Sequence, residues 1–306
     1  MINSPDAPYT NRLATQGALF TQSFGLTHPS QPNDLALFSG STQGITDNSC
    51  PHTFTTPNLG HGLLATGLTF AGYSEDLPAI GSLMCSAGPY ARKHNPWVNW
   101  QDSAANGLPA TTNVPMTNFP TEYSALPTVS IVVPNQVNDM HSGNNSEMIQ
   151  AGDRWLQTHL DSYVQWAQQH NSLLIVTWDE DNGKENNRIA TLFVGPMVQA
   201  GRYGQRVTHY SILRTIEDLY GLSHSGASAN ATSIIHIWTS TPRPGWASRV
   251  PYSEWNHVPR VIRATIKGIT RCTLRVFPIH RRQDACRIET LSNPELQYSI
   301  TAEQIA

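Results

Sequence analysis

The stretch Leu173-Leu-Ile-Val-Thr-Trp-Asp179-Glu180-Asp181-Asn-Gly183 decides the fold. Its first six residues are mostly aliphatic or β-branched, which is typical of a strand buried on both faces of a parallel sheet. Three acids then mark the carboxyl end of that strand, the edge at which open α/β sheets bind ligands. Carboxylates this close repel one another unless a cation, a proton or an arginine lies between them. The stretch therefore predicts a ligand site at a sheet edge, although a solvated acidic turn would have the same composition.

The composition is that of a globular protein. The 306 residues suffice for one large α/β domain or two small ones. Only 13% of them are charged, a low fraction that is frequent in exported enzymes, and the net charge of −3 gives no reason to expect a nucleic-acid partner. No run approaches the 18 apolar residues of a membrane span. Residues 1–5 lack the basic and apolar segments of a signal peptide, so none is visible in the sequence.

The cysteines leave two alternatives open. Cys50, Cys85, Cys272 and Cys286 lack the C-x-x-C spacing that is typical of metal sites. They could form two disulfides in an oxidising compartment or remain as buried thiols.

Charge divides the chain into two parts. Residues 1–240 contain nine Lys and Arg against 17 Asp and Glu, a net charge of −8, whereas residues 241–306 contain ten against five, a net charge of +5. The change falls in residues 239–245 (TSTPRPG), whose composition indicates a linker. We expect residues 1–240 to form the folded domain and residues 241–306, with a strand-like run at 272–278, to be a loosely packed basic tail. Such a tail could touch anionic surfaces, but a solvated end is the commoner case.

Strand and helix candidates alternate within the first 240 residues. The strand candidates are residues 68–72, 128–133, 173–178 and 189–194. The strongest amphipathic helices are predicted at residues 149–169 and 210–220. Helices between parallel-type strands imply right-handed crossovers, so the sequence predicts an α/β fold with a mainly parallel sheet.

Ser30 is bracketed by two prolines in residues 27–33 (THPSQPN). Each proline locks its own φ and restricts the residue before it, so the local backbone is rigid. A hydroxyl at such a turn, just before a helix, suits a nucleophile that attacks an anionic group. A plain helix N-cap is the commoner role for a serine at this place.

Further candidate side chains could bind phosphate or metal. Asn48 ends a glycine turn at residues 44–48, and Lys93 and His94 lie in a basic turn that could recognise phosphate or simply face solvent. Asp139 and His141 could ligate one cation, or could bond to each other and hold a loop. His209 is predicted to begin a helix, where the dipole would keep its imidazole neutral and able to ligate.

Five segments taken in order resemble one family. They are THPSQPNDLALFSG (residues 27–40), YARKHNP (90–96), NDMH (138–141), TWDEDNG (177–183) and THYSILRTIEDLYG (208–221). Together they resemble the bacterial and fungal phosphoesterase family, which holds secreted acid phosphatases and phospholipase C-type enzymes of the alkaline phosphatase superfamily. The resemblance covers about residues 4–238, and the tail that follows resembles nothing comparable.

The resemblance implies an alkaline-phosphatase-like fold, with a mainly parallel sheet sandwiched between helices and the site at the carboxyl ends of the strands. It implies that Ser30 is the nucleophile and that Asn48, Lys93 and His94 contact the substrate phosphate. The metal ligands that it implies are Asp179 and Glu180 beside the nucleophile, and Asp139, His141 and His209 at a second metal or at the phosphate.

The implied activity is metal-dependent hydrolysis of phosphate monoesters through a phosphoserine, with one or two divalent ions. Hydrolysis of diesters, as in phospholipase C-type members, is the nearer alternative. The implied substrates are small phosphate esters or phospholipids, and the implied location is secreted or at the cell surface.

One departure from the family pattern favours a different hypothesis. Members usually carry a Glu-Asn pair on a first strand, upstream of the segment that begins here at residues 2–8. We therefore expect the domain to lack its usual first strand and two ligands of one metal ion. A catalytically impaired homologue is the second hypothesis.

Overall fold

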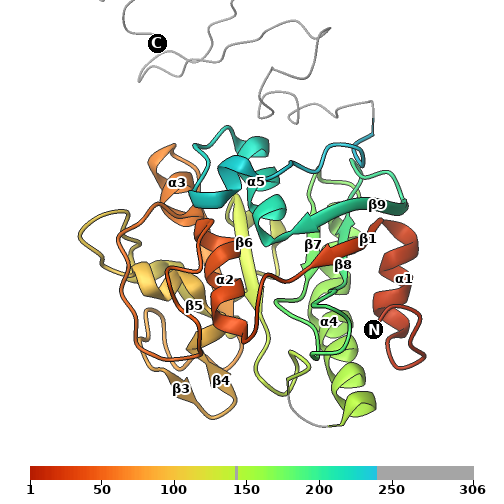
Figure 1. Ribbon diagram of the computed structural model, residues 1–306, viewed down its shortest axis with the longest axis horizontal. Coiled ribbons are helices and arrows are strands. Elements are labelled where there is room, and N and C mark those ends of the chain that lie inside the picture. The colour runs from red at the N-terminus through yellow and green to blue at the C-terminus, as the bar shows by residue number, and fades with distance from the viewer. Residues whose placement is uncertain (142–143, 240–306) are drawn as a thin grey trace, which may run out of the picture. The chain divides into compact units, whose positions relative to one another are not determined.

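The strands form two separate sheets and a small hairpin (Figure 1). The computed structural model describes residues 1–141 and 144–239, so the predicted tail and its strand-like run lie outside the described residues. The first sheet has the order β7–β8–β1–β9, with bounds Leu174–Thr177, Thr191–Val194, Ala18–Phe24 and Gly201–Thr208. The second has the order β5–β2–β6, with bounds Asn113–Pro115, Phe70–Ser74 and Val129–Val133. The hairpin pairs β3 (Ser86–Ala87) with β4 (Tyr90–Ala91).

The predicted α/β class is confirmed, with one difference in strand direction. β5 and β6 both run parallel to β2, and β9 runs parallel to β1. β8 runs antiparallel to β1 and β7, so the four-stranded sheet is mixed. The four predicted strands correspond to β2, β6, β7 and β8. β1, β5 and β9 were not predicted because three polar residues interrupt the apolar residues of β1, polar residues and glycine predominate in β9, and β5 has only three residues.

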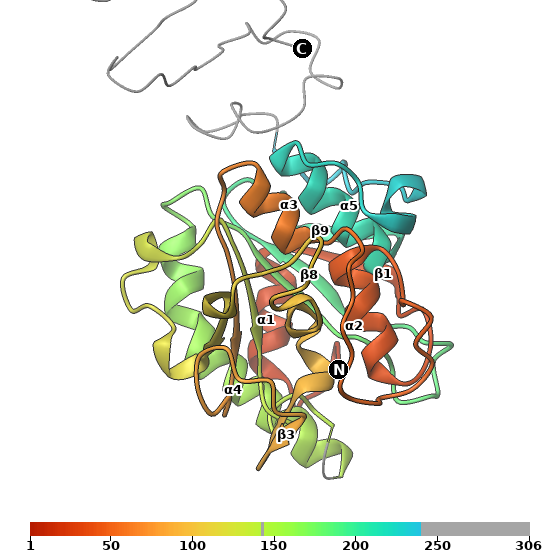
Figure 2. The same ribbon diagram turned by 90° about the vertical axis from the view of Figure 1, so that its left-hand side faces the viewer.

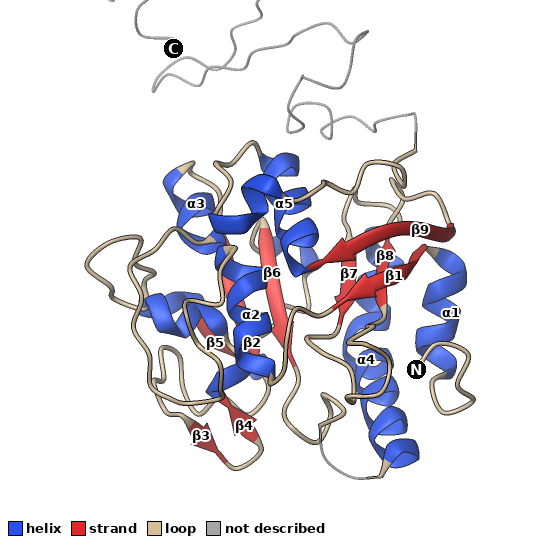
Figure 3. Ribbon diagram, in the orientation of Figure 1, coloured by secondary structure: helices blue, strands red, loops and turns tan. Residues whose placement is uncertain are grey.

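Helices cover both faces of the strands (Figures 2 and 3). The α-helices are α1 (Pro8–Gln16), α2 (Ser30–Ser39), α3 (Leu59–Ala65), α4 (Asn145–Ala167) and α5 (His209–Tyr220). Short 3₁₀ helices span Arg92–His94, Pro96–Trp100, Ala110–Thr112, Met116–Asn118, Tyr123–Ala125 and Gly226–Asn230. α1 and α4 pack on one face, and α2 and α5 on the other. In the part of the chain that the structure describes, no helix is both long and apolar enough to cross a membrane.

Both predicted long helices are present, and α4 begins earlier than predicted. The side chain of Asn144 accepts a hydrogen bond from the N–H of Glu147 and so caps the helix. The carboxylate of Glu147, in the first turn, also interacts favourably with the positive end of the helix dipole. α5 begins at His209, as predicted, and ends at Gly221, which takes the left-handed conformation that glycine adopts without strain.

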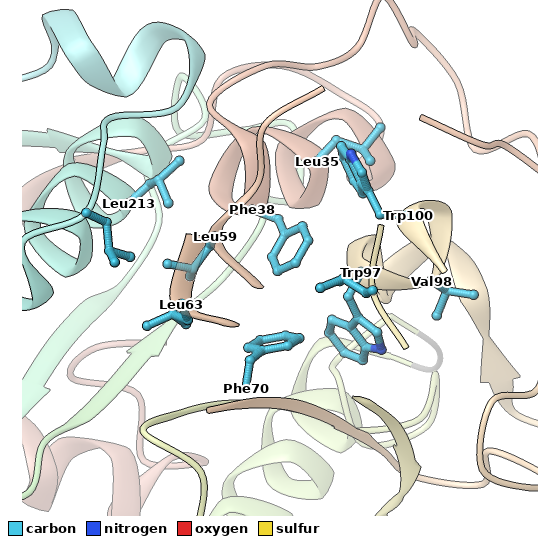
Figure 4. Packing of buried hydrophobic residues seen from close by; sticks show 11 residues of the cluster. Leu35, Phe38, Leu59, Leu63, Phe70, Trp97, Val98, Trp100 and Leu213 are labelled. Atoms are coloured by element: carbon cyan, nitrogen blue, oxygen red, sulfur yellow. The ribbon is translucent and has the colours of Figure 1, made fainter. Parts of the chain in front are cut away.

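An aromatic cluster anchors the segment that carries Lys93 and His94 (Figure 4). Trp97 and Trp100, which are 1% and 0% exposed, pack with Phe38 of α2 and Phe70 of β2. The ring of Trp97 lies directly over Gly72, where a Cβ would come within 2.1 Å of it. Only glycine allows this approach, and the approach holds the basic turn beside the end of the sheet.

β6 and β7 each pair with one neighbour only among the described residues. A cavity of about 1420 Å³ lies between them and is lined by both strands and by residues of α4 and α5. The five residues of β6, four of them valine or isoleucine, therefore remain half-buried. The two sheets do not join within the described residues, and the cavity reaches the carboxyl ends of β6 and β7.

Candidate active site

Ser30 is the first residue of α2 and is held by a tightly bonded turn. The His28–Pro29 peptide bond is cis, and the helix begins immediately after it. The side chain of Asn33 accepts the N–H of Leu26 at 2.8 Å and of Thr27 at 3.1 Å. The turn is therefore closed onto the first turn of the helix, and Ser30 is only 3% exposed.

The hydroxyl of Ser30 donates a hydrogen bond to Glu180. Its Oγ lies 3.1 Å from Oε1 of Glu180, and Oε2 of the same carboxylate lies 2.6 Å from Nδ1 of His28. Burial raises the pKa of Glu180, and the neighbouring charge of Asp179 raises it further. The predicted nucleophile thus lies against one of the predicted metal-ligating acids, which can accept its proton.

Asp181, the third acid after the strand β7, holds the loop that follows it. Asp181 accepts the N–H of Gly183 at 2.7 Å, of Glu185 at 2.7 Å and of Asn187 at 3.0 Å. Burial acts to raise the pKa of Asp181, but these backbone N–H groups outweigh burial and lower it. Because its oxygens are occupied by the loop, Asp181 serves to hold Asp179 and Glu180 in place.

Asp179 lies in a group of three possible metal ligands with Asp34 and His94. One donor atom from each side chain can be chosen so that all lie within 4.8 Å of one another. Burial raises the pKa of Asp34 well above its usual range, and the charge of Asp179 raises it further while Lys93 lowers it. The Oδ2 atom of Asp34 is buried without a hydrogen-bond partner among the described residues. A buried carboxylate oxygen without a partner is what a cation ligand looks like in the metal-free protein.

Asp139 contacts both its own loop and the candidate site. Its Oδ1 accepts the N–H of His141 at 2.8 Å, which is the loop-holding alternative for this pair. Its Oδ2 lies 3.2 Å from Nδ1 of His94. The rings of His94 and His141 are 6.2 Å apart. Burial lowers the pKa of His141, and the charge of Lys93 lowers it further, so the imidazole is held in the neutral form that binds metals.

His209 supports the backbone of Asp179. Its Nε2 donates to the carbonyl oxygen of Asp179 at 2.7 Å. The side chain is 1% exposed, and burial lowers its pKa and so favours the neutral imidazole, whereas the sequence analysis attributed that form to the helix dipole. Its Nδ1 is buried and has no hydrogen-bond partner in the described ranges 1–141 and 144–239. With Nε2 occupied, only Nδ1 is open to a ligand.

Asn48 lies against the N-terminus of α2. Its Oδ1 accepts the N–H of Gln31 at 3.0 Å. Since the amide oxygen is used in this way, the amide nitrogen is free to donate elsewhere beside Ser30. This geometry suits donation to a phosphoryl oxygen.

One end of the cavity brings together most of the predicted site residues. Those that line it are Ser30, His94, Asp139, His141, Asp179, Glu180 and His209. The structure adds His28 and Asp34, which sequence reasoning missed. Asp34 stands four residues after Ser30 on one helix, so the i, i+4 spacing was the signal that could have found it. His28 gave no signal of its own, because its partners Glu180 and Asp181 are about 150 residues away.

The donor set fits a divalent cation. Carboxylates and a neutral imidazole are the ligands that hard and borderline divalent ions prefer. The charge of Asp179 disfavours ionisation of Asp34, and a cation between the two carboxyl groups would remove that repulsion.

In this helix-covered α/β fold, a serine at a helix N-terminus lies beside clustered carboxylates, an arrangement that suits phosphoryl transfer. The model of the Phosphoesterase family matches residues 2–223. The chain belongs to the Phosphoesterase family, as the five sequence segments indicated. It is thereby a member of a family of phosphoric ester hydrolases.

Its relatives include named phosphatases. The chain is 50% identical over 241 residues to the phosphatidylinositol-3-phosphatase of Mycobacterium tuberculosis, covering 78% of each chain. It is 26% identical over 245 residues to an acid phosphatase of Aspergillus fumigatus, covering 74% of this chain and 53% of that protein. The chain thus spans about half the length of the fungal relative.

A solved structure shares the fold. It is that of a protein in the alkaline phosphatase superfamily from Vibrio parahaemolyticus, with a TM-score of 0.51 and 12% identity, covering 75% of this chain and 65% of that one. At this identity the likeness concerns the fold alone, and it agrees with the alkaline-phosphatase-like architecture expected from the sequence.

Proposed function

We propose that this chain hydrolyses phosphate monoesters with Ser30 as the nucleophile and with a divalent cation at the carboxylate cluster. The observation that carries the proposal is the hydrogen bond from Ser30 to Glu180 at the N-terminus of α2. A phosphoryl group approaching Ser30 meets backbone N–H groups and the positive end of a helix dipole. The 50% identical relative, named as a phosphatidylinositol-3-phosphatase, supports a monoester on a lipid headgroup as the substrate class.

Each residue of the site has its own role in the proposed hydrolysis. Glu180 takes the proton of Ser30 while the serine oxygen forms a bond to phosphorus, and the bond from phosphorus to the leaving alcohol breaks opposite it. The alcohol leaves with a proton from solvent. Water then attacks the phosphoserine and gives inorganic phosphate, and Ser30 regains its proton. Asn48 and Lys93 stabilise charge on the equatorial oxygens, where preorganised donors contribute most.

In this proposal a divalent cation would be held by Asp34, His94 and Asp179, while Glu180 keeps its hydrogen bond to Ser30. When bound, the cation would lower the pKa of the serine hydroxyl and offset the charge of the phosphate. Asp139 and His141 would not bind the cation directly in this proposal, because Asp139 contacts the ligand His94 instead. They orient His94 or contact the phosphate.

Removal of metal tests the proposal directly. We expect hydrolysis of an aryl phosphate to fall by at least about 100-fold after chelation, because a metal supplies several kcal/mol of charge stabilisation. Re-addition of a divalent ion should restore the rate. An aryl phosphodiester measured in parallel should react more slowly than the monoester. A rate that chelation leaves unchanged would contradict the metal role, and faster cleavage of the diester would favour the phospholipase C-type alternative.

An oxidising location is part of the same proposal. Cys50 and Cys85 are joined by a disulfide, while Cys272 and Cys286 lie outside the described residues. Disulfides persist in exported and cell-surface proteins and are rare in reducing compartments. The disulfide supports export, as does the resemblance to secreted phosphatases.

The edges of β6 and β7 that face the cavity pair with no further strand among the described residues, and they bear on the second candidate, a catalytically impaired homologue. The N–H of Val129 donates to Thr69, and the carbonyl of Val133 accepts from Glu75, so alternate residues of β6 bond to β2. By this alternation, the backbone groups of Ser130 and Val132 face the cavity. The Oγ of Ser130 is also buried without a partner among the described residues. Such an edge is a template for one more strand.

A strand placed in this cavity should raise both the stability of the domain and its affinity for a divalent ion. It would run parallel to β6 and β7, since both end at the site, and its last residues would therefore meet Asp179. Met1 lines the cavity, so we would fuse to it a seven-residue apolar strand that ends in Glu-Asn. We expect Tm to rise by at least about 4 °C, equivalent to roughly 1–2 kcal/mol for a domain of this size.

A matched fusion separates strand pairing from ligand supply. The same strand ending in Ala-Ala should raise Tm equally but leave the affinity for a divalent ion unchanged. A strand interrupted by two prolines should do neither, because proline cannot donate to the ladder. Equal Tm values for all three fusions and the parent chain would contradict the proposal that the cavity accepts a strand.

A further inference from the structure

Residues 77–91 form a loop without any Asp, Glu, Lys or Arg, and we call this segment the apolar loop. Its Ile80, Leu83 and Met84 side chains are 53%, 54% and 53% exposed. They are three of the five large hydrophobic side chains that are exposed in the described residues, the others being Val137 and Ile235. Single exposed apolar residues are common on protein surfaces, but three within five uncharged residues form a patch.

The backbone of the apolar loop is held in place from beneath. The side chain of Asn113 donates to the carbonyl of Ser82 at 2.9 Å, and Arg92 donates to the carbonyl of Leu83 at 3.0 Å. Both donors belong to buried residues, which are 1% and 5% exposed. The exposure of the aliphatic side chains is therefore built into the fold, because the buried partners fix the backbone that presents them.

The apolar loop is tied to segments of the candidate active site. Its Cys85 is joined by a disulfide to Cys50, two residues after Asn48. Pro89 accepts the N–H of Gln136, which belongs to the loop that leads to Asp139. The β3–β4 hairpin, which the apolar loop contains, lies at the same end of the molecule as the N-terminus of α2 (Figures 1 and 2). The apolar loop is therefore fixed to the segments that carry Asn48 and Asp139.

The chemistry of the patch matches a lipid surface better than a protein partner. Protein interfaces concentrate their binding energy in Trp, Tyr and Arg, and none of these is exposed in the loop, whose Tyr90 is only 1% exposed. Aliphatic side chains without neighbouring charge can enter the boundary between headgroups and acyl chains without desolvating an ion. Residues 1–240 have a net charge of −8, so the folded domain gains nothing from anionic lipids.

We propose that the apolar loop inserts Ile80, Leu83 and Met84 into the surface of a lipid bilayer and so presents the site to a phosphate monoester on a membrane lipid. The inference rests on the proposed function for its substrate, but the binding step is independent of catalysis. It names the surface through which this chain reaches its substrate.

The test is binding of the full chain to vesicles of phosphatidylcholine, which carry no net charge, so that the basic residues 241–306 contribute nothing by charge. The wild type should sediment with the vesicles. A triple variant, Ile80→Ser with Leu83→Ser and Met84→Ser, should bind at least about tenfold more weakly. Because these side chains are exposed, the variant should keep the wild-type Tm and the wild-type rate on a soluble aryl phosphate.

Ile235→Ser is the matched control, because this side chain is 40% exposed and lies outside the apolar loop, in the segment that follows α5. It should bind vesicles as the wild type does. Equal vesicle binding by the triple variant and the wild type would overturn the proposal. So would a wild type that ignores vesicles while the triple substitution changes its self-association, since the loop would then be a contact between copies. Loop-dependent binding without any aryl phosphatase activity would refute the proposed function and leave the loop proposal intact.

Discussion

Replacing Ser30 with alanine should lower kcat on an aryl phosphate by at least about 1,000-fold, the scale on which loss of a nucleophile acts. The hydroxyl donates to Glu180 and lies at the N-terminus of α2, so no other described side chain can take its place there. Removal of one oxygen from a residue that makes a single side-chain hydrogen bond leaves the fold intact. The measurement is steady-state turnover, with acid-quench trapping of phosphate on the protein.

Ser39→Ala provides the matched control on the same helix. Ser39 is buried, and its Oγ donates to the carbonyl of Leu35 at 2.7 Å, far from the carboxylates along α2. The control should retain the rate and the trapped phosphoserine of the wild type. Wild-type turnover by Ser30→Ala, or phosphate trapped on another residue, would refute the assignment of the nucleophile.

Asp179→Asn should change activity and metal-free stability in opposite directions. In the metal-free protein, the charge of Asp179 raises the pKa of both Asp34 and Glu180. Neutralising Asp179 removes that repulsion, so Tm in the presence of a chelator should rise by about 2 °C or more, equivalent to roughly 1 kcal/mol. The same change removes a ligand, so activity should fall at least about 100-fold and added metal should no longer raise Tm.

Asp181→Ala separates a ligand from a structural acid. Asp181 accepts three backbone N–H groups of its loop, and hydrogen bonds to a charged group contribute roughly 1.5–3 kcal/mol each. This variant should therefore lose Tm both with and without metal, unlike Asp179→Asn. If Asp179→Asn lowered the metal-free Tm, or still gained Tm from added metal, the cluster would not be a cation site.

Much of the candidate site could be predicted because its signals are local. Proline restricts the backbone of its neighbours, so the rigid turn at Ser30 can be predicted from the few residues around it. The run of aliphatic residues before Asp179 and Glu180 likewise predicts a buried strand and a sheet edge. The fold class followed from the same strands and from the periodicity of α4 and α5.

Other features could not be predicted because they depend on distant parts of the chain. From the sequence alone, Asp139 and His141 could either hold a loop or ligate a cation. In the structure, Oδ1 of Asp139 accepts the N–H of His141 within the loop, and Oδ2 contacts His94 in the candidate site. The structure assigns Nε2 of His209 to the backbone of Asp179, which no local signal indicates. β9, in which polar residues and glycine predominate, pairs along its length with β1, a contact between segments about 180 residues apart.

The sequence by itself determined the family, the fold class and the residues from which a site could be made, because periodicity, proline restriction and clustered charge act over short distances along the chain. Only the tertiary structure decided how these residues meet. It placed Ser30 against Glu180 across 150 positions and brought Asp34 to His94 and Asp179. Among the described residues it also leaves one edge each of β6 and β7 unpaired and exposes the aliphatic side chains of an uncharged loop. Contacts of this kind depend on packing and strand pairing between distant segments, which no local pattern encodes.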